Sequence, residues 1–214
     1  MSAPINYAGL AALARVIATR RSVRRYLQDC VPKALIDELV QCAVNAPSAH
    51  NRQPWRFTVL HDDRSKARLA DAMGAQLRAD RLKDGDPIAV VEADVARSFE
   101  RISRAPVVVL IAATIAEMDS YPDLRRQHAE HLMAIQSTAM AVQNLLLAAH
   151  AAGLATCWMC APLFCPDTVA LTLGLPEGWE PQALVTLGAP ASAGKPPVRK
   201  PVADALWRPP AVAD

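Results

Sequence analysis

The sequence predicts an α+β fold in which a sheet and helices form separate layers. Short apolar runs rich in β-branched residues alternate irregularly with longer segments of helical periodicity. They supply too few strand–helix–strand units for a doubly wound sheet. Of the 214 residues, 52% are hydrophobic and 21% are charged, which supports one sizeable core and excludes disorder as the main state. We expect one domain over residues 1–188 and a proline-rich arm over residues 189–214.

The first half of the chain predicts two helices, a strand and a third helix. Residues 8–20 repeat apolar side chains at helical spacing and end in arginines, which suit a helix C-terminus. The second helix begins at Pro32, because proline is tolerated in a first turn, and it ends before Pro47. Residues 57–60 form a short strand candidate, and a charged helix follows from Asp62 to about residue 82.

The middle of the chain predicts a helix over 88–103 and a strand over 107–112. The strand is a continuous β-branched run, which is typical of a strand buried on both faces. The longest helix covers 124–151. Its apolar stripe consists of Leu132, Ile135, Ala139, Val142, Leu146 and Ala149. Other apolar residues lie off this stripe, so the helix should be buried in a core or an interface.

The last part of the chain predicts two strands, a short helix and the arm. Gly153 is suited to end the long helix, and strands are expected over 154–159 and 183–187. Between them, Pro166 begins a short helix that Gly174 closes. Prolines then crowd the arm, at 190, 196, 197, 201, 209 and 210. This density favours an extended segment over a packed element.

Composition excludes several classes of protein. A formal net charge of +2 is too small for a general nucleic-acid binder. We find no signal-peptide pattern at the start, and the longest apolar run, 105–116, is too short to span a membrane. Five cysteines without regular spacing do not indicate a disulfide framework. A cytoplasmic globular protein is therefore expected.

Two polar segments are candidates for ligand binding. Residues 20–25 hold four arginines and a serine where a helix gives way to extended chain, and guanidinium groups pair bidentately with phosphate and carbonyl oxygens. A solvated helix end is the alternative. Residues 46–55 form a loop braced by two prolines, whose serine and amide groups could present hydrogen bonds to a planar heteroaromatic ligand. An ordinary turn is the alternative there.

Two further clusters suggest thiol or metal chemistry. Cys157 and Cys160 form a C-x-x-C pair near Cys165, but a strand directs this pair to opposite faces, which favours inert thiols over a dithiol or zinc site. His128 and His131 flank Glu130 at a spacing of three, whereas the zinc-protease motif needs a spacing of four. A helix-capping turn is the preferred interpretation of that segment.

Taken together, these segments resemble the flavin-dependent nitroreductase family. The motifs that carry the resemblance are R-R-S-V-R at 20–24, A-P-S-A-H-N-R-Q-P-W at 46–55, G-L-A-T-C-W-M at 153–159 and L-V-T-L-G-A-P at 184–190. The second half, notably residues 120–133, is similar to the C-terminal flavin domain of FbiB in deazaflavin-coenzyme biosynthesis. The family implies a central, mostly antiparallel sheet flanked by helices. It also implies an intertwined homodimer with two FMN sites at the subunit interface.

The resemblance also implies which residues surround FMN. Around its phosphate, ribityl chain and pyrimidine edge it places Arg20, Arg21, Ser22 and Arg24. From the partner subunit it brings Pro47, Ser48 and Asn51. Backbone at Met159 and Cys160 would approach the N5 side of the flavin, and Arg199 would reach the phosphate from the arm.

The implied activity is ping-pong reduction, in which NAD(P)H passes a hydride to flavin N5 and a small conjugated or aromatic acceptor is then reduced. No catalytic side chain and no metal are expected. Three alternatives stay open at this point: a reductase of a dehydro precursor of the deazaflavin coenzyme, a flavin-binding protein without turnover, and a thiol or zinc protein.

Overall fold

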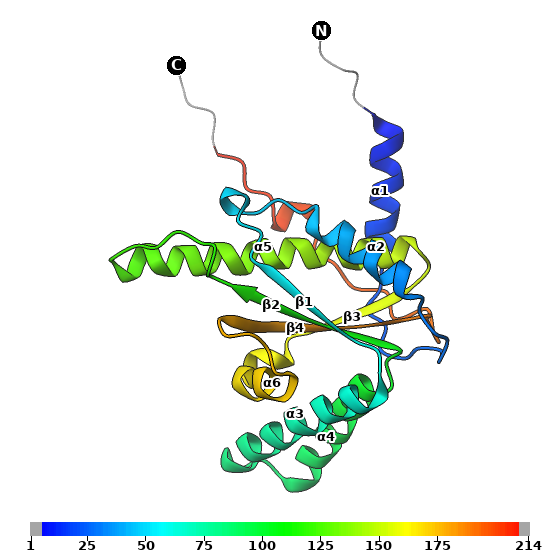
Figure 1. The fold of residues 1–214 in the computed structure, drawn as a ribbon. Coiled ribbons are helices and arrows are strands. Elements are labelled where there is room, and N and C mark those ends of the chain that lie inside the picture. Colours follow the sequence, from blue (N-terminus) through cyan, green and yellow to red (C-terminus); the bar gives the residue numbers. More distant parts are fainter. Residues whose placement is uncertain (1–5, 210–214) are drawn as a thin grey trace.

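The computed structural model describes residues 6–209 and contains a four-stranded sheet between two layers of helices (Figure 1). The strands are β1 (Trp55–Leu60), β2 (Val107–Thr114), β3 (Ala155–Met159) and β4 (Trp179–Gly188). Their order is β1-β2-β4-β3, and each neighbouring pair is antiparallel. The predicted α+β fold with an antiparallel sheet is confirmed.

The helices are α1 (Tyr7–Thr19), α2 (Lys33–Val44), α3 (Asp63–Lys83), α4 (Ile88–Ser103), α5 (Leu124–Ala151) and α6 (Pro166–Leu173). The short 3₁₀ turns are η1 (Ala49–Asn51), η2 (Ala161–Phe164) and η3 (Val202–Asp204). Side chains and glycines set the helix ends, as expected. Asp123 accepts a hydrogen bond from the Arg126 amide at 2.9 Å, and Gly174 closes α6 with a φ of 62°.

Strand β2 is the centre of the core, because both of its faces are buried. Val107, Val109 and Ile111 pack on the side covered by α2 and α5, whereas Val108 and Leu110 pack on the side of α3, α4 and α6. This alternation follows from the two-residue repeat of a strand. Its β-branched run was therefore correctly predicted to be buried on both faces.

Strand β4 is longer than the predicted segment 183–187, since it runs over ten residues from Trp179 to Gly188. Its first part includes Pro181, which lacks an amide donor and is disfavoured inside a sheet. The pairing with β2 shifts register between Ile111 and Ala112, next to the Ala112–Pro181 pair. This irregularity lets the proline lie within a central strand.

Helix α5 packs against the sheet, but its buried face differs from the predicted stripe. Of that stripe, Val142, Leu146 and Ala149 are buried, whereas Leu132 and Ala139 are exposed. Near the start of α5 the buried face carries polar side chains, including Glu130 and Ser137. An 18-residue window of this helix has a mean hydropathy of 1.4, which would suffice for a membrane span by length and composition. The sequence analysis considered only the uninterrupted apolar run 105–116 and did not identify this window.

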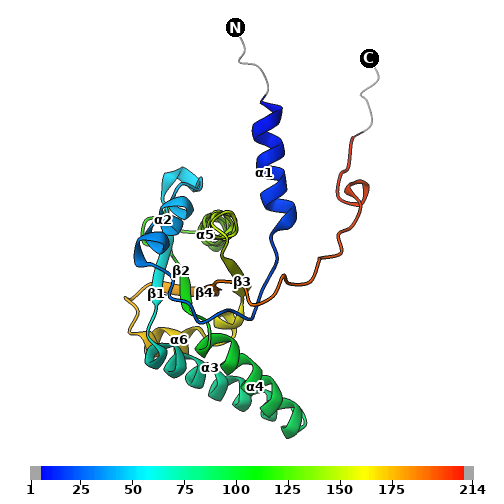
Figure 2. The same cartoon turned by 90° about the vertical axis from the view of Figure 1, so that its right-hand side faces the viewer.

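Helix α1 and the C-terminal arm extend away from the sheet and its covering helices (Figures 1 and 2). None of the residues of α1 is buried, and its apolar stripe of Leu10, Leu13 and Ile17 is at least half exposed. The arm begins with a bridge between Tyr26 and Pro190 and is exposed for most of its length, including Trp207. Both segments thus present apolar side chains that this chain alone leaves uncovered.

Candidate functional site

A large cavity lies beside the start of β2 and has a volume of about 1120 Å³. Three separate segments form its walls: residues 20–28, the second half of α4, and residues 192–199 of the arm. Small-molecule sites commonly enclose roughly 300–1,000 Å³, so this cavity is large enough for a nucleotide-sized ligand.

The segment after α1 is held along the edge of the sheet by backbone hydrogen bonds and by two buried side chains. The Val23 amide donates to the Thr156 carbonyl at 3.0 Å, and Ser22 forms a bridge with Thr156. Val23 and Tyr26 point into the core, and the Tyr26 hydroxyl bonds with Thr186 Oγ1 at 2.7 Å. Because these side chains face inward, Arg24 and its neighbours stay at the surface and line the cavity.

The cavity is lined by nine cationic side chains and one carboxylate, that of Glu100. The segment after α1 supplies Arg20, Arg21, Arg24 and Arg25. Helix α4 supplies Arg97 and Arg101, and its C-cap is Arg104. The arm supplies Lys195 and Arg199. Such a concentration of positive charge attracts phosphate and other anions.

Internal pairing neutralises only part of this charge. Glu100 accepts from Arg104 at 2.6 Å, and Arg97 pairs with Asp94. Burial, together with the charges of Arg24 and Arg97, lowers the pKa of the Arg101 guanidinium. A bound anion at this position would relieve that repulsion.

Arg21 differs from its neighbours because its guanidinium is engaged locally. It donates to the Ala18 carbonyl at 2.7 Å and to the Arg20 carbonyl at 2.8 Å, which satisfies the C-terminal end of α1. Arg21 therefore shapes the cavity wall, while Arg20 and Arg24 are available for a ligand.

The arm packs directly on the arginine segment at Gly194. This glycine has a φ of +71°, and a Cβ placed on it would lie 2.9 Å from Arg21 Cβ and 3.2 Å from Val23 Cγ2. Only glycine allows both this conformation and this close approach. The contact fixes the part of the arm that brings Lys195 and Arg199 to the cavity.

The structure brings five of the ten residues expected around FMN into this cavity: Arg20, Arg21, Ser22, Arg24 and Arg199. The other five lie elsewhere. Pro47, Ser48 and Asn51 belong to the loop around η1, near the opposite end of β2. Met159 ends β3 and Cys160 follows it, and neither lines the cavity.

The loop before β1 has an unusual backbone. Non-glycine residues with positive φ occur at His50, Asn51 and Gln53. Ser48 Oγ accepts from the Gln53 amide at 3.0 Å, and Ser137 Oγ on α5 accepts from the Ala49 amide at 3.2 Å. These bonds hold the loop on α5 in a conformation that costs energy, as is frequent at ligand sites.

The sequence analysis missed the arginines of α4. Arg97, Arg101 and Arg104 are spaced four and three residues apart, which places them on one face of a helix. That spacing could have predicted a cationic helix face, but the other charged residues of this segment are typical of an ordinary solvent-exposed helix. Only the packing of α4 next to residues 20–28 shows that this face lines a cavity.

The cysteine and histidine clusters show structural roles. All five cysteines are free; Cys157 is buried in β3, whereas Cys160 is exposed and follows the end of that strand, so the predicted alternation within one strand does not apply to this pair. Burial raises the pKa of the Cys157 thiol, which disfavours the nucleophilic thiolate. His131 pairs with Glu180 at 2.6 Å, and the segment before it is the expected capping turn.

Comparison with known proteins identifies relatives along most of the chain. The Nitroreductase family profile matches residues 17–189. A Thermus thermophilus protein named NADH dehydrogenase is 32% identical over 201 residues, which cover 88% of this chain and 92% of that protein.

Solved structures share the fold. One from Desulfovibrio desulfuricans, determined in complex with FMN, is 25% identical with a TM-score of 0.71, covering 98% of this chain and 100% of that chain. A BluB-like flavoprotein from Clostridium difficile is 24% identical with a TM-score of 0.77, covering 92% and 98% of the two chains.

Proposed function

The chain belongs to the Nitroreductase family, and we propose that it is an FMN-dependent oxidoreductase that transfers electrons from NAD(P)H to a small conjugated or aromatic acceptor. The observation that carries this proposal is the cation-lined cavity beside the start of β2. The relative named NADH dehydrogenase and the similar structure in complex with FMN support the donor and the cofactor.

The cavity suits FMN in size and charge. A phosphate monoester carries up to about two negative charges at neutral pH and accepts several hydrogen bonds. Arg20, Ser22 and Arg24 lie on one segment at the cavity wall, and Arg199 reaches it from the arm. We assign the phosphate to these four residues. The remaining cations, including Arg101, would stabilise negative charge on the reduced flavin ring.

The site is completed by a second copy of the chain in this proposal. The cavity begins beside Ala105, before β2, whereas the loop that carries Asn51 lies near the end of β2. Eight residues of strand span roughly 26 Å, so one chain keeps these groups at opposite ends of its sheet. In a homodimer, Pro47, Ser48 and Asn51 of one chain would reach the cavity of the other.

Uncovered apolar surface supports this homodimer. Tyr7, Leu10 and Ile17 of α1 are 70%, 60% and 51% exposed, and Trp207 of the arm is 78% exposed. Apolar groups of this size in neighbouring segments indicate an interaction surface. If α1 and the arm pack on the second copy of the chain, these side chains become buried and Arg199 is held against the cavity.

When bound, FMN would supply the redox chemistry, which is two-electron transfer from NAD(P)H to the acceptor. The chain holds the phosphate, orients the ring and keeps cations near its pyrimidine edge. Backbone at Met159 and Cys160 is assigned to the N5 side. No catalytic side chain is proposed.

The test is the absorbance spectrum of the purified protein before and after anaerobic addition of NADH or NADPH. We expect a yellow protein that either donor bleaches and that an acceptor restores. A yellow protein that no donor bleaches would instead indicate a flavin carrier. A colourless protein that takes up no added FMN would contradict the proposal.

A second candidate acceptor follows from the resemblance of residues 120–133 to the FbiB flavin domain. In this case the protein would reduce a dehydro precursor of the deazaflavin coenzyme. The flavin test would give the same result, so the two are separated by steady-state kinetics. Turnover of the precursor with a kcat/KM well above that of simple nitroaromatics or quinones would favour the second candidate.

A further inference from the structure

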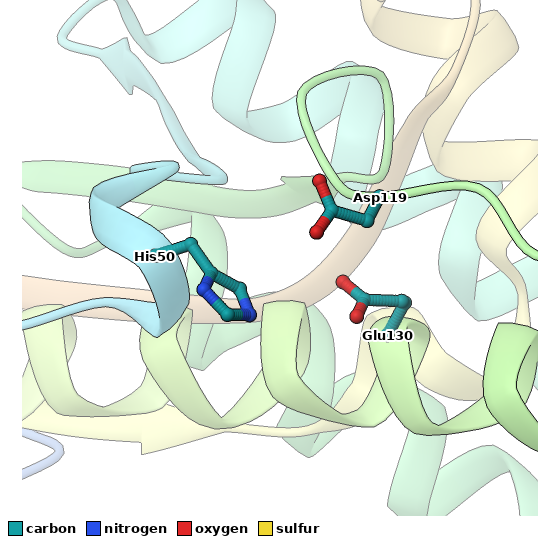
Figure 3. A group of neighbouring side chains, drawn as sticks. All are labelled: His50, Asp119 and Glu130. Atoms are coloured by element: carbon teal, nitrogen blue, oxygen red, sulfur yellow. The ribbon is translucent and has the colours of Figure 1, made fainter.

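Three potential metal ligands meet at the end of the sheet opposite the cavity. His50 comes from η1, Asp119 from the turn after β2, and Glu130 from α5 (Figure 3). Ligand atoms of the three side chains all lie within 4.8 Å of one another. Figure 3 shows the His50 ring and the two carboxylates directed toward a common space.

Glu130 is the second and independent sign of a ligand. Glu130 is only 3% exposed, and its Oε2 atom has no hydrogen-bond partner among the described residues. A buried carboxylate without a partner is costly, and such groups are usually paired or bound to a metal. The unpartnered carboxylate faces the other two ligands (Figure 3).

The surrounding structure positions the other two ligands. The bonds of Ser48 and Ser137 described above fix the loop, and a φ of 49° at His50 turns it over α5. Asp119 Oδ1 pairs with Arg52 Nη2, which orients the carboxylate and leaves Oδ2 free of that pair. Arg52 therefore acts as a positioning residue for Asp119.

The donor set selects the class of ion. One imidazole nitrogen and two carboxylates suit zinc, manganese or iron(II) better than soft ions, which prefer thiolates. Zinc bonds to these donors are about 2.0–2.2 Å long, so two ligand atoms of a tetrahedral zinc ion lie roughly 3.4 Å apart. The three side chains, whose ligand atoms lie within 4.8 Å of one another, would therefore close by up to about 1.4 Å when the ion binds. His50 is exposed and provides an entry path.

We propose that His50, Asp119 and Glu130 form a binding site for a divalent transition-metal ion, with water in the remaining coordination positions. The ion would link η1, the turn after β2, and α5. It would also supply the positive partner that Glu130 Oε2 lacks. The site shares no residue with the cation-lined cavity, but His50 lies in the same loop as Pro47, Ser48 and Asn51, which we assign to the partner's flavin site. The test below therefore measures metal binding directly and does not use flavin binding or activity as its readout.

The experiment measures metal binding by the full-length protein after treatment with a chelator and removal of that chelator. Isothermal titration with Zn²⁺ and with Mn²⁺ should show one site per chain. Glu130→Gln and His50→Gln should each lower the metal affinity at least roughly 100-fold, since even the loss of a residue that only supports a ligand costs 10–100-fold in affinity. Asp119→Asn, at a half-exposed position, tests the site if Glu130→Gln does not fold.

Two controls separate this site from other ligands. His128→Gln removes an exposed histidine two residues before Glu130 and should leave metal binding unchanged. The Co²⁺-loaded protein should show no thiolate charge-transfer band, which excludes Cys157, Cys160 and Cys165 as ligands. Binding that is equally tight in wild type and the three ligand variants would overturn the proposal. So would a wild-type protein without a site for either ion.

Discussion

The two polar regions of this molecule lie near opposite ends of β2 and differ in both charge and construction. Near the start of the strand, cationic side chains line an open cavity, and four of them come from the short run 20–25. Near its end, His50, Asp119 and Glu130 come from three separate segments, and one carboxylate is almost fully buried. Nearly half of the cations in the first region are therefore close neighbours in the sequence, whereas the three residues of the second region come together only in the folded chain.

The difference has an energetic consequence. Exposed or half-buried arginines stay hydrated without a ligand, so an empty cavity costs little. A buried carboxylate oxygen without a partner carries a desolvation penalty of a few kcal/mol. Substitutions in the cavity should therefore change ligand binding while stability without ligand is kept. Substitutions at the buried cluster should change stability itself.

Removing the arm should have the largest effect on the cavity. Truncation after Gly188 deletes Lys195 and Arg199 from the wall, together with the apolar residues that we assign to the partner surface. We expect a monomer that does not retain flavin. Sedimentation at micromolar concentration and the flavin absorbance of the same sample measure both. A full-length monomer with stoichiometric FMN would contradict the shared site.

Single arginine changes should weaken FMN binding without unfolding the chain. Arg20→Ala and Arg24→Ala each remove a charge-assisted bond worth roughly 1.5–3 kcal/mol, or about 10–150-fold in Kd. Fluorescence titration of the flavin-free protein with FMN gives the Kd, and thermal melts of that protein should not move. Arg125→Ala, an exposed arginine on α5, is the matched control. Equal FMN affinity in the wild type and the three variants would contradict the assignment of the phosphate to these arginines.

A methyl group at Gly194 should have a smaller effect, through the position of the arm. Gly194→Ala places a Cβ 2.9 Å from Arg21 Cβ at a positive φ, so the arm must shift. We expect about a tenfold rise in the Kd for FMN. Gly85→Ala adds the same backbone strain at φ +86° with nothing within 4 Å, and it should leave FMN binding unchanged. If both variants behave alike, the arm does not shape the cavity.

The cysteines should matter least. A Cys157→Ser/Cys160→Ser double variant should keep most of its NAD(P)H-dependent activity, because the Cys157 thiol is buried and only the backbone of Cys160, which the substitution keeps, is assigned to the flavin. Steady-state turnover of the flavin-loaded variant is the measurement. Loss of turnover with flavin still bound would instead support a dithiol mechanism that uses Cys157 and Cys160.

Local patterns in the sequence determined most of the secondary structure. Helices α4 and α5 have the predicted bounds, because helical periodicity, an N-terminal Asp123 cap and a terminal Gly153 act within one or two turns. The burial of β2 on both faces followed from its β-branched run. The arginines of residues 20–25 were also identified, since their density is visible without any contact.

Tertiary packing decided the rest, because it depends on contacts between distant segments. It extended β4 through Pro181 by means of a register shift in the pairing with β2, and it rotated the buried face of α5 away from the predicted stripe. It brought the arginines of α4 to those of residues 20–25. It also enclosed Glu130 beside His50 and Asp119, residues as far as 80 positions apart in the sequence. The periodicity of the sequence does not predict this cluster, because its three residues come together only when β2, α5 and the loop before β1 pack against one another.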